Sequence, residues 1–247
     1  MTTATPQSVS PLGSLPVIHV DDHLVVVNKP SGLLSVPGRG ADKQDCVWHR
    51  VQTHFTDALV VHRLDQATSG LLVLARGLEA QRRLSDAFAK RQVNKCYLAW
   101  VHGHPRKSAN DVTTPPQLHE PGWNAIDLPL MADWPNRPRQ IVSPDGKPCL
   151  TYWRLIEQLD APDRSLLELR PHTGRSHQLR VHLQAIGHPI LGDDLYGHSP
   201  APASPALQLH AWQLRLPHPF EDRTLDLQAP LPSHWGQIGA EPTDRSV

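Results

Sequence analysis

The sequence predicts an α+β fold around a mainly antiparallel sheet, and three observations support this. Short β-branched runs outnumber the segments with helical periodicity. The runs come in adjacent pairs joined by turn residues, whereas a doubly wound parallel fold would alternate strands strictly with helices. A chain of 247 residues, 39% of them hydrophobic, is also long enough to bury a sizeable core. We therefore expect a globular protein whose sheet is assembled largely from hairpins.

The N-terminal half of the chain is predicted to be rich in strands. Residues 1–16 contain many Thr, Ser and Pro residues, which is typical of a disordered leader. In the segment 78–92, Ala80, Leu84 and Ala87 recur at helical spacing and predict an amphipathic helix. Apolar runs with the composition of strands are found at 17–20, 24–28, 71–75 and 95–102.

The C-terminal half is predicted to hold one long loop, a hairpin and a helix. Residues 104–125 are polar and Pro-rich without periodicity, which indicates a surface loop or insertion. Leu179 and Leu183 share one face of a predicted helix that Gly187 ends. We see no internal repeat and expect one domain over residues 17–230. Paired strands are expected at 151–158 and 165–170, terminal strands at 207–216 and 224–228, and a weakly ordered tail at 231–247.

Composition limits the classes of protein that the chain can represent. The 24 basic and 24 acidic side chains cancel, so any nucleic-acid surface must be a local patch. The three cysteines are far apart without CxxC spacing, which indicates neither a disulfide framework nor a zinc site and fits a reducing cytoplasm. The N-terminal segment lacks the features of a signal peptide, and no run reaches the ~20 apolar residues of a membrane span. We expect a soluble, cytoplasmic protein with no membrane partner.

The most informative stretch is the polar turn HRLDQATSG at 62–70, which lies between two apolar segments. It places Asp65 near Arg63 on a polar turn between two apolar segments, which is how a fold presents one reactive carboxylate on a rigid platform. The alternative is a turn whose Asp and Ser only bind backbone groups, because Asp, Thr, Ser and Gly are common turn residues. The turn by itself leaves both interpretations open.

The second cluster is TGRSHQLRVH at 173–182, where a loop leads into the predicted helix. The helix N-terminus adds N–H donors to the charge of Arg175, which favours an anion. Arg175 could also pair with Asp65 and keep its carboxylate ionised, since an opposite charge nearby lowers an Asp pKa by ~1–3 units. It could equally be a helix-capping residue on the surface. His177 and His182 are too far apart for a helical metal site and no HExxH pattern accompanies them, so no metal site is predicted.

Four motifs that follow one another along the chain resemble the RluA-type pseudouridine synthases, and the resemblance extends over about residues 17–230. One motif alone would be a weak signal, because four common residues such as HRLD recur by chance. The four together leave little room for coincidence. The motifs are VVVNKPSG at 25–32, HRLD with TSG at 62–70, KCYLA at 95–99, and the set R, GRSHQLR, GHPILGD and YG within 170–197.

The resemblance implies an isomerase that converts uridine to pseudouridine in RNA without a cofactor or metal. It implies that Asp65 is the catalytic carboxylate, that Tyr97 stacks on the target base and that Arg175 pairs with Asp65. The reaction breaks the bond from ribose C1′ to uracil N1 and rejoins the base through C5. The uridine must leave its stack for this, which costs least in a loop. RNA-binding residues are expected at His62, Arg63, Thr68, Arg137, Arg139 and Arg180.

The expected substrate follows from the segment LPLMADWPNRPRQ at 128–140, which resembles the short, single-domain members of the family. Those enzymes modify a loop uridine of 23S rRNA and a uridine of the tRNA anticodon loop, so the partner is expected to be such a stem-loop and the enzyme a monomer. Only about sixteen residues precede the first expected strand, so we expect no N-terminal S4 domain. Arg137, Arg139 and Lys147 would form the local basic patch, unless they are ordinary solvated charges.

Three alternatives stay open. The segment 104–125 is longer than in the short members, which leaves a synthase for a different single uridine of rRNA or tRNA. A catalytically silent RNA-binding protein would be favoured if a motif residue were missing, but Asp65, Tyr97 and Arg175 are all present. An Asp-dependent hydrolase would need a second carboxylate, and the acidic pair Asp193-Asp194 lies in a segment that the family uses for structure.

Overall fold

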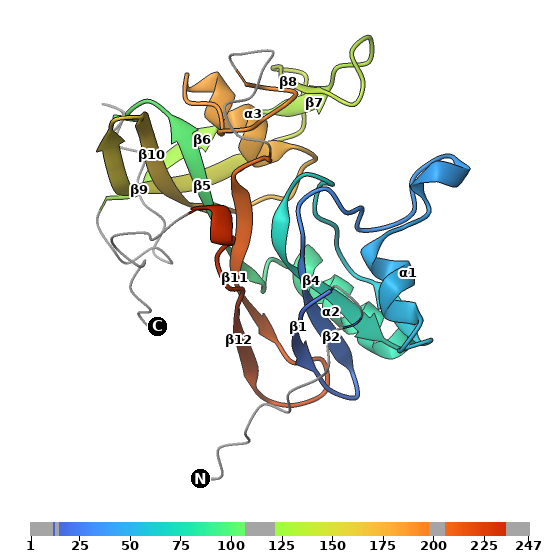
Figure 1. Cartoon of the computed structure of the whole chain (residues 1–247). Coiled ribbons are helices and arrows are strands. Elements are labelled where there is room, and N and C mark those ends of the chain that lie inside the picture. The colour runs from blue at the N-terminus through green and yellow to red at the C-terminus, as the bar shows by residue number, and fades with distance from the viewer. Residues whose placement is uncertain (1–11, 13–14, 107–121, 198–205, 236–247) are drawn as a thin grey trace. The chain divides into compact units, whose positions relative to one another are not determined.

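The computed structural model describes residues 12, 15–106, 122–197 and 206–235, which form two compact units (Figure 1). Of these described residues, the first unit takes those up to Lys95 and Ala211–Pro230, and the second takes those between Cys96 and His210 and those from Leu231 to Trp235. No helix among the described residues is long and apolar enough to cross a membrane. The domain predicted over residues 17–230 takes in residues of both units.

The first unit is built on the β-branched runs near the N-terminus. Asp21 shapes the first hairpin turn, because its Oδ1 accepts hydrogen bonds from the backbone N–H groups of His23 at 2.8 Å and Leu24 at 2.9 Å. The strands lie in the order β1 (Val17–Val20), β2 (Leu24–Lys29), β4 (Ser69–Arg76) and β11 (Leu209–Pro217), with β3 (Ala58–Val60) paired to β4 and β12 (Thr224–Gln228) paired to β11.

Helix α2 (Leu78–Ala89) covers one face of these strands (Figure 1). Ala80, Leu84 and Ala87 are buried in an apolar cluster with side chains of β2, β4, β11 and β12. Burying one Leu side chain stabilises a protein by roughly 1.5–3 kcal/mol, so the amphipathic pattern is sufficient to hold the helix in place. The helix ends before the predicted bound because Arg91 takes a left-handed conformation, with φ 58°. The sequence does not predict the short helix α1 (Val47–Gln52).

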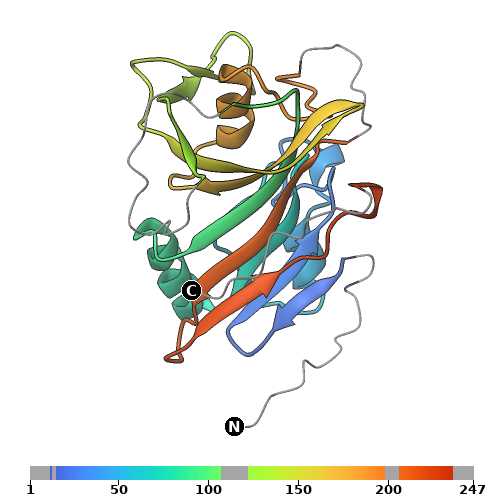
Figure 2. The same ribbon diagram turned by 90° about the vertical axis from the view of Figure 1, so that its left-hand side faces the viewer.

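The second unit contains the predicted hairpin, whose two strands are drawn in yellow in Figure 2. Its strands lie in the order β5 (Asn94–His102), β10 (Asp163–Pro171), β9 (Leu150–Asp160) and β6 (Asn124–Asp127), while β7 (Leu130–Ala132) and β8 (Gln140–Val142) form a separate antiparallel pair. Helix α3 (Gln178–Ala185) packs against β8 and β9. Leu179 and Leu183, the two residues that predicted this helix, are both buried.

The prediction of an α+β fold is confirmed, and the pairs β1–β2, β2–β4, β5–β10 and β9–β10 are antiparallel. Three segments differ from their predictions. Strand β6 lies partly within the predicted loop 104–125, Leu12 and Leu15 of the predicted leader are buried, and Trp235 of the predicted tail is buried in a 3-10 helix. In each case an apolar side chain in a polar segment has a burial site that local composition does not reveal. Residues 1–11, 13–14, 107–121, 198–205 and 236–247 lie outside the described residues.

Gly70 and Gly77 offer a matched test of the packing in the first unit, since both have positive φ, 109° and 81°. A Cβ at Gly70 would lie 2.2 Å from the carbonyl oxygen of Ala211, whereas a Cβ at Gly77 has open space. We expect Gly77→Ala to cost only a backbone penalty of about 1–3 kcal/mol, because φ 81° with ψ 161° is a conformation that is essentially restricted to glycine. We expect Gly70→Ala to cost at least about 3 kcal/mol, because a steric clash adds to that penalty. Equal losses in urea unfolding would contradict the clash.

Candidate active site

Asp65 lies in the predicted polar turn, between β3 and β4, and its side chain is half-buried. The backbone N–H of Thr68 donates to the carbonyl oxygen of Asp65 at 3.1 Å and closes the turn. The turn leads directly into β4, which is buried from Ser69 to Ala75. Asp65 is therefore attached to a strand whose residues are almost all buried.

A fully buried lysine, Lys29, lies beneath this turn at the end of β2, directly opposite Gly70 in the strand register. Its Nζ donates to three backbone carbonyl oxygens, those of Pro30 at 3.0 Å, Leu33 at 2.7 Å and Gln66 at 2.9 Å. Three acceptors match the three N–H bonds of an ammonium group. Burial lowers the pKa of Lys29 to about 7, against the opposing effect of the negative charge on Asp65. Lys29 thus links the end of β2 to the turn that carries Asp65.

The segment after Lys29 holds the same turn with polar groups. Ser31 Oγ donates to the carbonyl oxygen of Ala67 at 2.7 Å. Ser35 Oγ both donates to the carbonyl oxygen of Leu64 at 2.7 Å and accepts from its N–H at 3.1 Å. The carbonyl oxygen of Gln66, which accepts from Lys29, also accepts from the backbone N–H of Gly32. The side-chain amide of Gln66 in turn donates to the carbonyl oxygen of Gly32. Residues on both sides of Asp65 are therefore fixed, which preorganises its carboxylate.

Sequence reasoning assigned no role to Lys29, Ser31 or Ser35. One signal was present in the sequence, because a lysine followed by proline directly after the apolar run 24–27 places a charged group at the end of a buried strand. Such a lysine must find hydrogen-bond acceptors inside the protein. The sequence does not say that those acceptors belong to the Asp65 turn.

His62 takes part in packing the turn against the first unit. Its Nε2 accepts a hydrogen bond from the backbone N–H of Val73 at 3.0 Å, and its ring stacks on Phe88 with the centroids 4.6 Å apart. Burial of the ring, together with the positive charge of Lys95, lowers the pKa of His62 to about 3. The neutral imidazole is therefore the form that accepts the bond from Val73. The RNA-binding role of His62 stays a prediction, and a contact through its charge is not expected at neutral pH.

The other two residues of this turn that were predicted to bind RNA differ in exposure. Arg63 is exposed, so its guanidinium is available to solvent. The side chain of Thr68 is 3% exposed, and its N–H serves the turn around Asp65. Of the two, Arg63 has the accessibility that an RNA contact requires.

In the second unit, Gln178 holds the loop that carries Arg175. Its Oε1 accepts from the hydroxyl of Thr173 at 2.8 Å and from the backbone N–H of Arg175 at 3.0 Å. Its Nε2 donates to the carbonyl oxygen of Leu150 at 2.9 Å and to the hydroxyl of Thr151 at 3.0 Å. One buried amide thus joins the loop to the first residues of β9.

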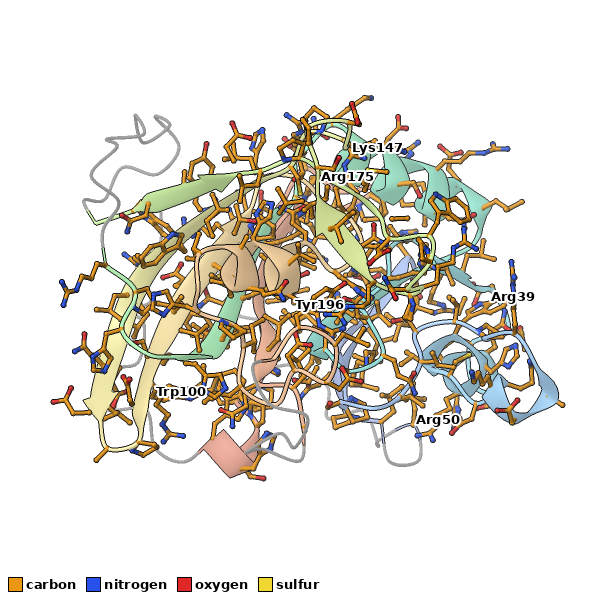
Figure 3. All side chains as sticks on the ribbon, turned by 90° about the horizontal axis from the view of Figure 1, so that it is seen from above. Arg39, Arg50, Trp100, Lys147, Arg175 and Tyr196 are labelled. Atoms are coloured by element: carbon orange, nitrogen blue, oxygen red, sulfur yellow. The ribbon has the colours of Figure 1, made fainter. Side chains whose placement is uncertain are left out.

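Arg175 itself is exposed, and its Nε donates to the carbonyl oxygen of Pro148 at 3.5 Å. Figure 3 shows Arg175 beside Lys147, the residue before that proline. Tyr97 is half-buried on β5, opposite Leu169 of β10. Both residues belong to the second unit, whereas Asp65 belongs to the first, so the predicted pair of Asp65 and Arg175 stays a prediction.

The charged residues predicted to bind RNA in the second unit divide into two kinds. Arg137 is exposed and Arg139 is half-buried, and both lie between β7 and β8. Arg180 is 3% exposed, with Nε and Nη2 bound to both carboxylate oxygens of Asp193 at 2.8 and 2.6 Å and Nη2 also 2.9 Å from Asp194. Removing one partner of such a buried pair is strongly destabilising, so Arg180 serves the fold and is excluded from the RNA contacts proposed below.

The two histidines of the predicted cluster at 173–182, His177 before α3 and His182 within it, serve local structure. His177 has a left-handed backbone, with φ 54°, and its Nδ1 lies 2.7 Å from the hydroxyl of Tyr196. His182 bonds through its two ring nitrogens to Thr151 Oγ1 and to the carbonyl oxygen of Leu128. In the described parts of the chain, no group of three His, Cys, Asp or Glu side chains is placed to hold a metal ion.

Comparison with known proteins gives consistent matches. A family model described as RNA pseudouridylate synthase matches residues 23–185, which include Asp65, Tyr97 and Arg175. The dual-specificity RNA pseudouridine synthase RluA of Escherichia coli (strain K12) is 45% identical over 218 residues, 87% of this chain and 93% of that protein. The protein of the same name from Yersinia pestis is 47% identical over 205 residues, 82% of this chain and 92% of that protein.

Two solved structures resemble the chain as well. Human RNA Pseudouridylate Synthase Domain Containing 1 has a TM-score of 0.68 and 26% identity, covering 90% of this chain and 85% of that one. Human RNA Pseudouridylate Synthase Domain Containing 4 has a TM-score of 0.67 and 26% identity, covering 89% of this chain and 90% of that one.

The burial of Lys29 predicts a dependence of stability on pH. The folded-state pKa of about 7 lies below the ordinary value of 10.5, so between these values the unfolded chain binds more protons. The free energy of unfolding should therefore rise with pH in this window, by up to about 1.4 kcal/mol per unit, and should show no such slope below it. Lys29→Met removes the contribution.

The measurement is urea unfolding of wild type and Lys29→Met from pH 6 to pH 10. Lys95, whose pKa burial lowers to about 8, contributes a slope of the same sign in both proteins, so it cancels in the difference. The stability advantage of wild type should grow above pH 7. Lys29→Gln, whose side-chain amide donates hydrogen bonds but does not titrate, should behave like Lys29→Met. A difference that stays constant across the range would contradict a depressed pKa.

Proposed function

Because the chain belongs to the RNA pseudouridine synthase family, we propose that it converts uridine to pseudouridine in stem-loop RNA. The family match and 45% identity across 87% of the chain are the observations that carry this proposal. The structure of the first unit supports it, because buried groups hold Asp65 on a rigid turn. The reaction is an isomerisation, in which N1 gains a proton and C5 loses one.

Asp65 is the proposed catalytic carboxylate. The bond from ribose C1′ to uracil N1 breaks, the base turns within the pocket, and C5 forms the new bond to C1′. Attack on the sugar, attack on the base and abstraction of a ribose proton all require the same ionised carboxylate against the nucleotide. Lys29 holds the turn that carries this carboxylate, because its Nζ donates to the carbonyl oxygen of Gln66.

Tyr97 and Arg175 are proposed to act on the nucleotide and on Asp65. The half-buried ring of Tyr97 suits a stacking surface for the target base, and the exposed guanidinium of Arg175 suits a pair with Asp65. Tyr97, a water molecule or Asp65 itself would accept the C5 proton. A phenol near its ordinary pKa of ~10 is a poor base without help, so stacking is the role that we assign to Tyr97.

The target uridine must be extruded from its stack, which costs a few kcal/mol and least in a loop. We propose that Arg63, Arg137 and Arg139 contact the RNA around it. We further propose that the chain acts as a monomer in the cytoplasm on both a 23S rRNA loop and a tRNA anticodon loop. Its relatives are named dual-specificity synthases, which supports two substrates. A synthase for one uridine is the second candidate, because residues 104–125 form a longer segment than the short family members carry.

Asp65→Asn tests the chemistry, because it removes the charge and keeps the shape of the side chain. We expect pseudouridine formation to fall by at least about 10³-fold, while the affinity for RNA stays within about threefold of wild type. Product is measured by carbodiimide modification and reverse transcription of a 23S rRNA stem-loop and a tRNA. Asp86→Asn, on the exposed surface of α2, is the control and should retain activity. Continued isomerisation by Asp65→Asn would refute the assigned role.

The same assay separates the substrate alternatives. Modification of both RNAs by wild type supports dual specificity, and modification of one supports the second candidate. Wild type that binds both RNAs but modifies neither would overturn the proposed enzyme and favour an RNA-binding protein.

A further inference from the structure

Trp134 is a large aromatic side chain exposed to solvent, with 64% of its surface accessible. It lies in the loop between β7 and β8, and the guanidinium of Arg137 stacks over its ring, with Cζ 3.3 Å from the centroid. We call residues 130–147, which contain this loop, the basic hairpin. Trp and Arg are both enriched at recognition surfaces, so this exposed, stacked pair is a candidate contact for a partner.

The loop that presents Trp134 is closed by its own hydrogen bonds. The N–H of Asp133 donates to the carbonyl oxygen of Arg139 at 3.0 Å, and the N–H of Arg139 donates to that of Asn136 at 3.1 Å. The side-chain amide of Asn136 also donates to the carboxylate of Asp133 at 3.0 Å. A ligand that stacks on Trp134 therefore meets a preorganised loop and loses little free energy in ordering it.

The basic hairpin is anchored to the body of the second unit. The N–H of Gln140 donates to the hydroxyl of Tyr196 at 2.8 Å, and Leu130 is buried beside Tyr196, Cys149 and Val181. Leu130 also exchanges two backbone hydrogen bonds with Lys147, at 3.0 and 2.8 Å. The hairpin is thus held at its base and projects its loop.

The basic hairpin adjoins the loop of Arg175. The Nε of Arg175 reaches the carbonyl oxygen of Pro148, the residue that follows Lys147, and Figure 3 shows Lys147 and Arg175 next to each other. Among the residues that the structure describes, none supplies a carboxylate within ion-pair distance of Arg137, Arg139 or Lys147. These three cations outnumber the two carboxylates of the hairpin, those of Asp133 and Asp145. The basic hairpin therefore has a net positive charge, although the net charge of the whole chain is zero.

We propose that Trp134 stacks on an unpaired base of the substrate RNA, while Arg137, Arg139 and Lys147 bind the phosphates on either side. This inference rests on the proposed function and extends it to a contact beyond the modified uridine. An aromatic face combined with nearby cations is the combination that single-stranded RNA recognises, because every base offers a π-face and every phosphate a negative charge. Arg137, already stacked on one face of the indole, places its charge beside the base on the other face.

The first test measures RNA affinity of Trp134→Ala and Trp134→Phe in the Asp65→Asn background, which prevents turnover. Stacking of one base on an aromatic side chain is lost in the alanine variant, so the dissociation constant for the stem-loop should rise about tenfold. The phenylalanine variant should stay within about threefold. Leu78→Ala is the matched control, because Leu78 is also 64% exposed and lies on a helix of the first unit. It should bind like the parent.

The second test identifies the base. Each loop nucleotide of the stem-loop is replaced in turn by an abasic nucleotide, and binding is compared between the parent and Trp134→Ala. At one position the abasic replacement should weaken RNA binding by the parent about tenfold. The same replacement should change binding by Trp134→Ala by no more than about twofold, because this variant already lacks the indole on which the base stacks. Equal penalties in both proteins at every position would overturn the proposal.

Salt and turnover separate stacking from charge. Arg137→Gln should lower the slope of log affinity against log salt concentration by about 0.7, whereas Trp134→Ala should leave the slope unchanged. In the active enzyme, Trp134→Ala should raise KM about tenfold and keep kcat within about threefold. If the wild type is active and Trp134→Ala binds RNA with the same affinity, the inference is refuted and the proposed function stays intact. Inactive wild type refutes the proposed function instead.

Other occupants of the surface give different results. If Trp134→Ala leaves RNA binding unchanged but abolishes self-association in sedimentation equilibrium, the hairpin is an interface between copies of the chain and the proposal is wrong. Unchanged RNA binding together with unchanged sedimentation also overturns it.

Discussion

The arrangement around Asp65 depends on the buried ammonium of Lys29. The turn between β3 and β4 belongs to neither strand, so its carbonyl groups have no partners in a regular ladder. Leaving a buried carbonyl without a partner costs about 1–3 kcal/mol. The Nζ of Lys29 donates to three backbone carbonyl oxygens. Two of them belong to Pro30 and Leu33, and the third belongs to Gln66 in the turn. The position of the carboxylate is thus set by a residue far from it in sequence.

The second unit holds its own loop in the same manner. Gln178 is 4% exposed, and its amide satisfies groups on the loop before α3 and on the start of β9. In both units one buried polar side chain substitutes for regular secondary structure. Such loops keep residues such as Asp65 and Arg175 accessible, because their side chains are not needed for packing. The fold can therefore combine an exposed reactive group with a fixed backbone, which is what preorganised chemistry requires.

The basic hairpin shows how a chain without net charge can still recognise RNA. Its cations are concentrated on a short closed loop, while many other charges in the described residues form local pairs, such as Arg83 with Glu79. Arg180, by contrast, forms a buried ion pair with Asp193. Net charge and the count of basic residues therefore say little about the RNA surface. The distribution of partnered and unpartnered cations is what defines it.

Local sequence determined much of this protein. Apolar and β-branched runs predicted β1, β2, β4, β5 and the β9–β10 hairpin, and the helical period of apolar residues predicted α2 and α3, because these signals depend on residues near in sequence. The motifs around Asp65, Tyr97 and Arg175 were sufficient to identify the family, which the comparisons confirm.

Only the tertiary structure decided the roles of residues whose partners are distant in sequence. Lys29 donates to the carbonyl oxygen of Gln66, Arg180 is buried against Asp193, and His177 takes a left-handed backbone conformation. Trp235 and Leu15 are buried in segments of polar composition. Such hydrogen bonds and burial sites form where two segments distant in sequence come into contact. The periodicity of apolar residues within one segment does not predict which other segment it will contact.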